Sequence, residues 1–146
     1  MASVSTYLNF NGTTEEAFNF YAKVFGTEFS APIFRIGETP ADAGMPEMPD
    51  EIKNLVMNVQ LPILAGHVLM GTDIIESMGH TLTVGNNTTI NLLPDTRAET
   101  LRLYTELSQG STECQEMSDM FWGAYFGTCL DRFGIRWMFN CYEPAA

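Results

Sequence analysis

Few residues in this chain have the types and spacing that catalysis usually requires. Its two histidines, His67 and His80, lie in no Ser–His–Asp or Cys–His arrangement, and no glycine-rich loop suited to phosphate is present. The three cysteines follow no metal-binding spacing: Cys114, Cys129 and Cys141. Because they are odd in number and follow no such spacing, we interpret the three as reduced thiols of a cytoplasmic protein. No histidine neighbours Cys129 or Cys141 in sequence to activate the thiol.

The residues that could recognise a ligand are concentrated near the end of the chain. Phe121 and Trp122 form the densest aromatic cluster, and their flat rings could stack on a bound molecule or pack in a core or a dimer. Asp119 could act as a base, although an exposed loop carboxylate usually only meets solvent. Arg136 is hard to bury without a partner, so we expect it either on the surface or in contact with an anion.

Composition and charge exclude several classes of partner. The 146 residues suffice for one domain with a proper core. Seven Lys and Arg residues against 18 Asp and Glu residues give a net charge of −11 with no basic cluster, so nucleic acids and anionic membranes are not expected partners. No signal peptide opens the sequence, and no apolar run reaches the roughly 18–20 residues of a membrane span.

A repeated strand–helix junction must position these residues. Residues 7–21 and 90–104 each run from a strand-like segment into the same helix-start signal. The signal is a capping box that occurs twice, with the two copies 83 residues apart: Thr13-x-x-Glu16 and Thr96-x-x-Glu99. The final hairpins also correspond, with residues 66–70 matching 134–138 at an offset of 68. Two such correspondences predict two similar βαβββ modules, each burying one face.

The hydrophobic pattern predicts the elements of each module. In the first half we expect strands at 4–10, 28–36, 54–63 and 67–71, and a helix at 14–25 that ends at Gly26. In the second half we expect strands at 88–93, 112–117, 124–130 and 135–142, and a helix at 96–108. Residues 37–51 contain three prolines and two glycines, which predicts an irregular loop that is functional or mobile. A turn at 131–134 would place Cys129 opposite Arg136 and Cys141 opposite Ala124, so these two cysteines are not expected to pair.

Both ends of the chain resemble one family. The matching segments are Tyr7-Leu-Asn-Phe-Asn-Gly, Ala17-Phe-Asn-Phe-Tyr-Ala-Lys-Val-Phe-Gly26, Leu69-Met-Gly-Thr-Asp73, Phe121-Trp-Gly-Ala-Tyr-Phe-Gly127 and the hairpin from Thr128 to Asn140. They resemble the PhnB-like branch of the vicinal oxygen chelate superfamily, which also holds glyoxalase I, the bleomycin-resistance proteins and the extradiol dioxygenases.

The resemblance implies an α+β fold and a homodimer. Two βαβββ modules would form a curved, mostly antiparallel sheet around a central cleft, with the helices on the outer faces. The chain would then be a single domain made of module 1 (about 1–73), a linker (about 74–86) and module 2 (about 87–146).

The same resemblance locates the positions where metal-using relatives hold their ion, usually with His, Gln or Glu. Carried onto this sequence, these positions fall at Ser5, Met70, Thr88 and Met138. Thioethers suit soft metals and hydroxyls alone hold divalent ions weakly, so we expect no metal and no other cofactor. Relatives are often described as methyltransferase-like. The sequence does not indicate methyl transfer, because no strand is followed by a glycine-rich turn of the kind that binds nucleotides.

Strand alternation and the resemblance together give the candidate ligand-binding residues: Tyr7, Asn9, Met70, Trp122, Tyr125, Arg136, Met138 and Asn140. A largely apolar wall with a few amides and one cation suits a small organic molecule, although the same side chains could also fill a core. Our hypothesis is a metal-free protein that binds a small apolar or aromatic molecule in the cleft. The alternatives are a metal-dependent lyase, isomerase or dioxygenase whose ligands lie elsewhere, and a structural or interaction protein with a filled cleft.

Overall fold

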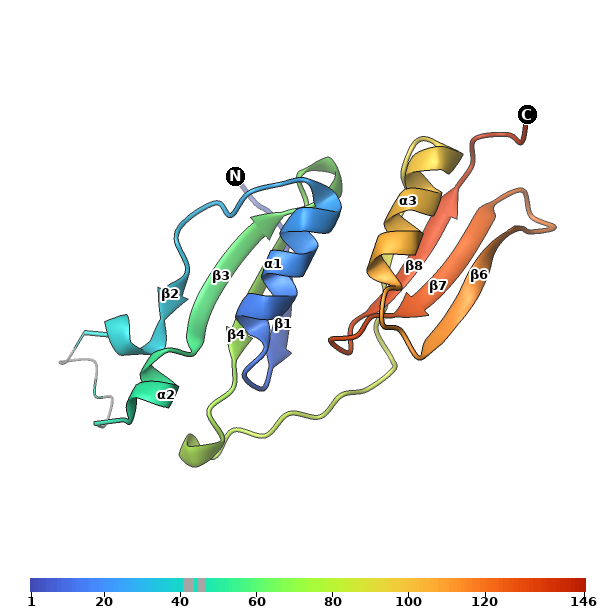
Figure 1. The fold of residues 1–146 in the computed structure, drawn as a ribbon. Coiled ribbons are helices and arrows are strands. Elements are labelled where there is room, and N and C mark those ends of the chain that lie inside the picture. Colours follow the sequence, from blue (N-terminus) through green and yellow to red (C-terminus); the bar gives the residue numbers. More distant parts are fainter. Residues whose placement is uncertain (41–43, 45–46) are drawn as a thin grey trace. The chain divides into compact units, whose positions relative to one another are not determined.

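The computed structural model describes residues 1–40, 44 and 47–146. The chain divides into two compact units, unit 1 (Met1–Thr83) and unit 2 (Val84–Ala146). Each unit has a four-stranded sheet and one long helix that packs on it (Figure 1). Within the described ranges, no helix is long and apolar enough to cross a membrane.

Unit 1 contains the four strands and the long helix of the predicted pattern, together with several short helical turns. Its elements are β1 (Thr6–Phe10), α1 (Thr14–Phe25), β2 (Phe34–Arg35), η1 (Ile36–Glu38), α2 (Asp50–Lys53), β3 (Val56–Pro62), η3 (Leu64–Gly66), β4 (Val68–Asp73) and η4 (Glu76–Met78). The strand order is β1-β4-β3-β2, with β1 parallel to β4 and the other neighbours antiparallel.

Unit 2 repeats this topology. Its elements are β5 (Ile90–Leu92), α3 (Arg97–Leu107), β6 (Glu113–Asp119), β7 (Tyr125–Leu130) and β8 (Arg136–Cys141). The order is β5-β8-β7-β6, again with one parallel pair, β5 with β8, and antiparallel neighbours otherwise. The predicted α+β fold of two βαβββ modules is therefore confirmed.

The long helices form where the apolar spacing predicts them. In α1 the buried residues Ala17, Tyr21 and Val24 recur at helical spacing, and Gly26 ends the helix in a left-handed conformation with φ of 65°. These side chains pack against β3 and β4, while α3 packs against β7 and β8. Each sheet thus has one face covered by a helix.

The two helix starts differ from the predicted pair of capping boxes. Thr96 accepts a hydrogen bond from the Glu99 amide at 3.1 Å, as predicted. Thr13 makes no such cap, and the prediction is wrong there. Instead the backbone amide and hydroxyl of Thr14 both donate to the buried Asp73 carboxylate at the end of β4, at 3.1 and 2.6 Å. A carboxylate brought from a distant strand replaces the local cap.

Two predicted segments also differ. The strand expected at 28–36 is only two residues long, Phe34–Arg35, because Pro32 has no N–H to give a ladder and the register shifts between Phe34 and Arg35. The loop expected at 37–51 takes up short helical turns at its ends, in η1 and α2. Residues 41–43 and 45–46 of that loop lie outside the described part of the chain.

Strand register in the last hairpin is one residue away from the predicted pairing. Cys129 lies opposite Trp137 and Cys141 opposite Tyr125, rather than opposite Arg136 and Ala124. The cause is the turn itself: the Asp131 amide donates to the Ile135 carbonyl, so the turn contains three residues, 132–134, instead of the expected four.

Candidate ligand-binding faces

Each sheet leaves one face without a helix, which we call its open face. In unit 1 the open face carries Tyr7, Asn9, Asn58, Gln60, Met70 and Thr72. In unit 2 it carries Asn91, Phe126, Thr128, Arg136, Met138 and Asn140. Their strand neighbours on the other face, such as Leu8, Leu69, Trp137 and Phe139, are buried beneath the helices. Six of the eight predicted ligand-binding residues therefore lie on open faces.

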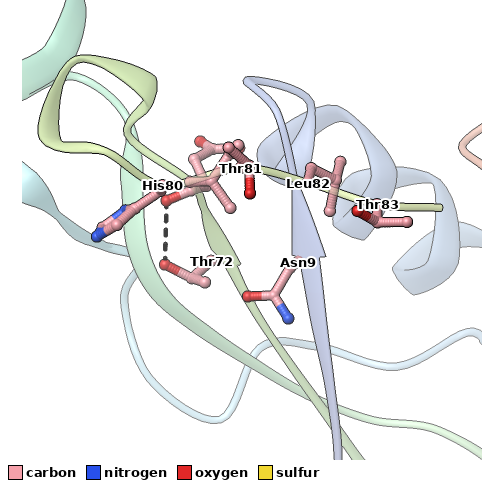
Figure 2. Close-up of a pocket in the computed structure, with 8 residues that line it drawn as sticks. Asn9, Thr72, His80, Thr81, Leu82 and Thr83 are labelled. Atoms are coloured by element: carbon pink, nitrogen blue, oxygen red, sulfur yellow. Dashed lines mark hydrogen bonds between the residues drawn. The ribbon is translucent and has the colours of Figure 1, made fainter.

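The open face of unit 1 carries a cavity of about 560 Å³ at the carboxyl ends of β1 and β4. Figure 2 shows Asn9 and Thr72 side by side on these strands, with the segment from His80 to Thr83 running across them. The His80 imidazole turns away from the cavity and accepts a hydrogen bond from the Ile75 amide at 3.1 Å. The lining residues carry hydroxyl, amide and aliphatic groups, one carboxylate (Asp73) and the His80 imidazole, and they include no Lys or Arg.

Further along the same face, polar side chains form a row. The Asn58 amide donates to the Tyr7 hydroxyl at 3.4 Å, and the Gln60 amide donates to Asn58 at 3.3 Å. The Ser5 hydroxyl lies 3.5 Å from the Met70 sulfur. These contacts fix an amphipathic surface on which aromatic, amide and thioether groups alternate.

The open face of unit 2 carries a smaller cavity of about 330 Å³ at the amino ends of β5 and β8. Arg136 and Met138 line it together with Thr128 and Gln115. One guanidinium nitrogen of Arg136 pairs with the Glu113 carboxylate at 3.1 Å, while its Nε atom is buried and has no hydrogen-bond partner among the described residues. The side chain therefore has donors left for a bound anion or carbonyl.

Toward the other end of β8, Asn140 is buried and donates to Asn91 at 2.8 Å. The rings of Trp122 and Phe126 meet edge to face with centroids 5.6 Å apart, and Phe121 packs on Trp122 at 5.0 Å. Aromatic rings, a thioether and a guanidinium thus share one sheet face.

Tyr125 lies on the opposite, helix-covered face. It pairs with Cys141, and the Arg97 guanidinium of α3 stacks on its ring at 4.1 Å. Arg97 also forms a bidentate ion pair with Asp119 at 2.7 and 3.0 Å, and this hydrogen bonding lowers the pKa of the Asp119 carboxyl. Asp119, the candidate base, is therefore an ionised partner of a guanidinium, remote from Met138 in the sheet.

The chemistry of the donor set does not fit a hard divalent ion. Met70 and Met138 offer thioether sulfur, and the Ser5 hydroxyl is directed at the Met70 sulfur. In unit 2, Thr89 rather than Thr88 lines the cavity beside Met138. Across the described residues no three His, Cys, Asp or Glu side chains come together as a possible metal site. These groups would suit only a soft metal, and weakly.

Two features of the unit 2 open face were not predicted from the sequence. Phe126 and Thr128 share the open face with Met138 because β7 pairs with β8, and strand alternation back from Met138 could have identified both. The ion pair between Glu113 and Arg136 had no such signal, because an irregularity between Gln115 and Ser118 sets the register of β6.

Comparison with known proteins gives a consistent set of matches. The model of a family described as 3-demethylubiquinone-9 3-methyltransferase matches residues 2–139. Protein YjdN of Escherichia coli (strain K12) is 27% identical over 143 residues, which cover 94% of this chain and 93% of YjdN.

Solved structures match over nearly the whole chain. Protein PA1353 from Pseudomonas aeruginosa has a TM-score of 0.80 at 30% identity and covers 97% of this chain and 98% of its own. The PhnB protein from Bacillus cereus has a TM-score of 0.72 at 22% identity, with 96% and 99% covered. A glyoxylase/bleomycin resistance protein/dioxygenase domain from Frankia sp. EAN1pec shares the fold at 8% identity, with a TM-score of 0.63 and 100% and 96% covered.

Proposed function

The chain belongs to the 3-demethylubiquinone-9 3-methyltransferase family, in the PhnB-like branch of the vicinal oxygen chelate superfamily, and from this premise we propose that it is a metal-free binding protein. Its ligand is a small apolar or aromatic molecule held on the open faces of the sheets. The observation that carries the proposal is the composition of the unit 2 open face, where Met138, Phe126 and Arg136 lie together and the metal-binding positions hold thioether and hydroxyl groups.

Apolar contact supplies the binding energy in this proposal. The exposed part of Trp122, the half-buried Phe126 ring and the Met138 thioether offer aromatic and polarisable surface, which gains most from burying a flat apolar ligand. Asn140 and Arg136 then fix the orientation, and Arg136 favours a ligand with a carboxylate because its Nε atom is unpartnered within the described chain.

The methyl transfer in the family's description is not part of the proposal. The amides at both helix starts, where the carboxylate or phosphate of a nucleotide cofactor would bind, already meet carboxylates of the chain itself. The Thr14 amide donates to Asp73, and the Arg97 amide donates to Glu143 at 2.6 Å. The turn between β1 and α1 holds one glycine, Gly12.

Calorimetric titration with matched aromatic carboxylates and neutral aromatic amides tests the role of Arg136. We expect the Arg136→Met variant to lose about tenfold or more in affinity for the carboxylates and little for the amides, because a charge-assisted hydrogen bond contributes about 1.5–3 kcal/mol. Arg102→Gln, on the exposed surface of α3, is the matched control and should leave both affinities unchanged. Equal loss for both ligand classes, or none, would contradict the assigned role.

We also propose that the chain forms a homodimer in the cytoplasm. Phe121 is a large apolar side chain that is 97% exposed, which favours coverage of this part of the surface by another chain. The three free cysteines favour a reducing compartment.

A further inference from the structure

Two of the three cysteines lie directly opposite each other in the sheet of unit 2. Cys114 of β6 pairs in register with Cys129 of β7, and both are free thiols. The sequence gives no signal for this pair, because it is produced by the register of β6, which the irregularity after Gln115 sets. Cys141, by contrast, pairs with Tyr125.

The hydrogen-bonding pattern shows which kind of cross-strand pair this is. In antiparallel sheets the N–H and C=O of one residue point to the same neighbouring strand, and successive residues alternate between neighbours. The Asp131 amide donates to Ile135 at the closing end of the β7–β8 hairpin, so Cys129, two residues earlier, also directs its backbone groups to β8. Relative to β6, Cys114 and Cys129 are therefore a non-hydrogen-bonded pair.

Such pairs bring the side chains closest together. Their Cα atoms are about 4.5 Å apart, which lies inside the range of about 4.4–6.8 Å found for disulfides. Side chains of directly opposed residues also share one face of the sheet. The spacing of such a pair is therefore within reach of a disulfide.

The two thiols also influence each other and one tyrosine of α3. Burial, with Asp131 and Cys114 nearby, raises the pKa of the Cys129 thiol to about 12. Burial, together with the neighbouring Cys114 thiol, raises the pKa of the Tyr104 hydroxyl. Both shifts place the Cys114 thiol near Cys129 and near Tyr104 of α3.

The pair is asymmetric in access to solvent. Cys114 is exposed on the edge strand, whereas only 3% of Cys129 is accessible. An oxidant in solution therefore meets Cys114 more readily than Cys129.

We propose that Cys114 and Cys129 form a peroxide-reactive thiol pair that closes into a cross-strand disulfide. The Cys114 thiolate attacks one oxygen of hydrogen peroxide, which forms an S–O bond, breaks the O–O bond and releases hydroxide that is protonated to water. The Cys129 sulfur then attacks the Cys114 sulfur. The S–S bond forms, the S–O bond breaks, and the leaving hydroxide takes the Cys129 proton as a second water. Two thiols are oxidised and one peroxide is reduced.

Proximity makes the second step possible although Cys129 is seldom ionised. Because the two cysteines lie directly opposite each other in the ladder, the reaction is intramolecular and needs no encounter between molecules. The product ties β6 to β7 across the hairpin whose turn carries Trp122, and so restrains one border of the unit 2 open face.

The test is oxidation of the full-length protein followed by counting of its thiols. The reduced, desalted chain is treated with one equivalent of hydrogen peroxide, unfolded, alkylated and analysed by intact mass and peptide mapping. We expect loss of two hydrogen atoms, a single alkylated cysteine at Cys141 and one linked peptide pair containing Cys114 and Cys129. Dithiothreitol should restore three alkylated cysteines.

Two variants distinguish this pair from other oxidations. Cys114→Ser, a change at an exposed position, should abolish the mass loss, and Cys129→Ala should leave Cys114 oxidised by added oxygen without an internal link. Persistence of all three thiols, accumulation of oxygen on Cys114 in the wild-type chain, or a disulfide only between two chains would overturn the proposal.

Discussion

The side-chain carboxylates of two buried aspartates each accept at least three hydrogen bonds and connect different parts of their units. Asp73 accepts from the Thr14 amide and hydroxyl and from the Val56 amide at 2.9 Å, which joins α1, β3 and β4. Asp131 accepts from two amides of its own turn, those of Phe133 and Ile135, and from a side chain of β8. At the scale of single residues, these two buried carboxylates connect neighbouring elements of the fold.

Replacing Asp131 should destabilise the protein markedly. The indole Nε1 of the fully buried Trp137 donates to Asp131 at 2.8 Å, so Asp131→Ala leaves this donor and two backbone amides without their acceptor. We expect a loss of about 2–4 kcal/mol in the free energy of unfolding, measured by urea titration. Asp95→Ala, at an exposed position before α3, is the control and should change it by less than about 0.5 kcal/mol. A similar small effect at both positions would contradict the assigned role.

The hydrogen bonds at single residues were only partly predictable from the sequence. The cap at Thr96 is local, formed with a residue three positions away, and the motif predicted it. The cap at the start of α1 comes from Asp73, 59 residues away from Thr14, and no local pattern contains that information. The same limit applies to the Glu113 partner of Arg136.

At the scale of elements, the two units fill the same space between helix and sheet with a ring from different elements. Gly71 of β4 and Phe139 of β8 occupy equivalent positions, since each lies opposite the corresponding leucine of the parallel strand. In unit 1 the Phe18 ring of α1 fills the space above Gly71. In unit 2 the Phe139 ring fills it from the strand and meets Tyr104 edge to face at 5.4 Å. At this position the ring comes from the helix in unit 1 and from the strand in unit 2.

Gly71→Ala should therefore be destabilising although it adds a single methyl group. A Cβ atom at Gly71 would lie 2.5 Å from Cε1 of the fully buried Phe18 ring, so the helix or the ring must move. We expect a loss of about 1–3 kcal/mol in thermal or urea unfolding. The double variant with Phe18→Leu should lose less than the sum of the two single changes. Gly85→Ala, where a Cβ meets only the Asn87 side chain at 3.8 Å, should be neutral; an equal loss there would contradict this explanation.

The contact between β2 and α1 should depend on pH. Arg35 forms a bidentate ion pair with Glu15 at 3.0 and 2.9 Å, and this hydrogen bonding lowers the pKa of Glu15. A carboxyl whose pKa is lowered by folding stabilises the protein above its unfolded pKa of about 4.3, and the contribution disappears as the pH falls through the folded pKa.

Urea unfolding of the Glu15→Gln variant at two pH values measures this contribution. At pH 7 we expect the variant to be less stable than the wild type by up to about 1 kcal/mol, because both partners are partly exposed. At pH 3 the difference should shrink toward zero. Glu16→Gln, at the exposed neighbouring position, is the control; a difference that grew on acidification would contradict the assignment.

At the scale of the whole molecule, the internal repeat was the most reliable sequence signal. The offsets of 83 between helix starts and 68 between final hairpins both hold in the structure, where Thr14 and Arg97 begin the two helices and Leu69 and Trp137 are equivalent. The first strands follow an offset of 84, since Leu8 and Leu92 hold the same place in the ladder. One residue is missing from the turn before α3, which is why Thr89 rather than Thr88 lines the unit 2 cavity.

The sequence could predict which sheet face a candidate ligand-binding residue occupies, because successive residues of a strand point to opposite faces. Arg136, Met138 and Asn140 lie on one open face as expected from their spacing. Tyr125 lies on the helix-covered face. It is the first residue of β7 and pairs with Asp119 of β6, and the turn at Gly123 between the two strands sets this pairing. Whether these residues bind a ligand stays a prediction.

The proposed homodimer gives a prediction for the mass in solution. Light scattering coupled to size exclusion should give about twice 16.3 kDa at micromolar concentration. Placing a charge at the exposed Phe121, in Phe121→Glu, should shift the equilibrium toward the monomer if this side chain forms part of the contact. A mass of one chain at all concentrations would contradict the dimer.

The most direct test of metal-free binding on the open faces is methyl NMR of the nine methionines during ligand titration in the presence of a chelator. With ¹³C-labelled methionine methyl groups assigned by Met138→Leu and Met70→Leu, aromatic carboxylates are added to chelator-treated protein. We predict that the Met138 methyl signal shifts and saturates, with less than stoichiometric metal in the purified protein. A Met138 signal that responds only after zinc, nickel, iron or manganese is restored would contradict it.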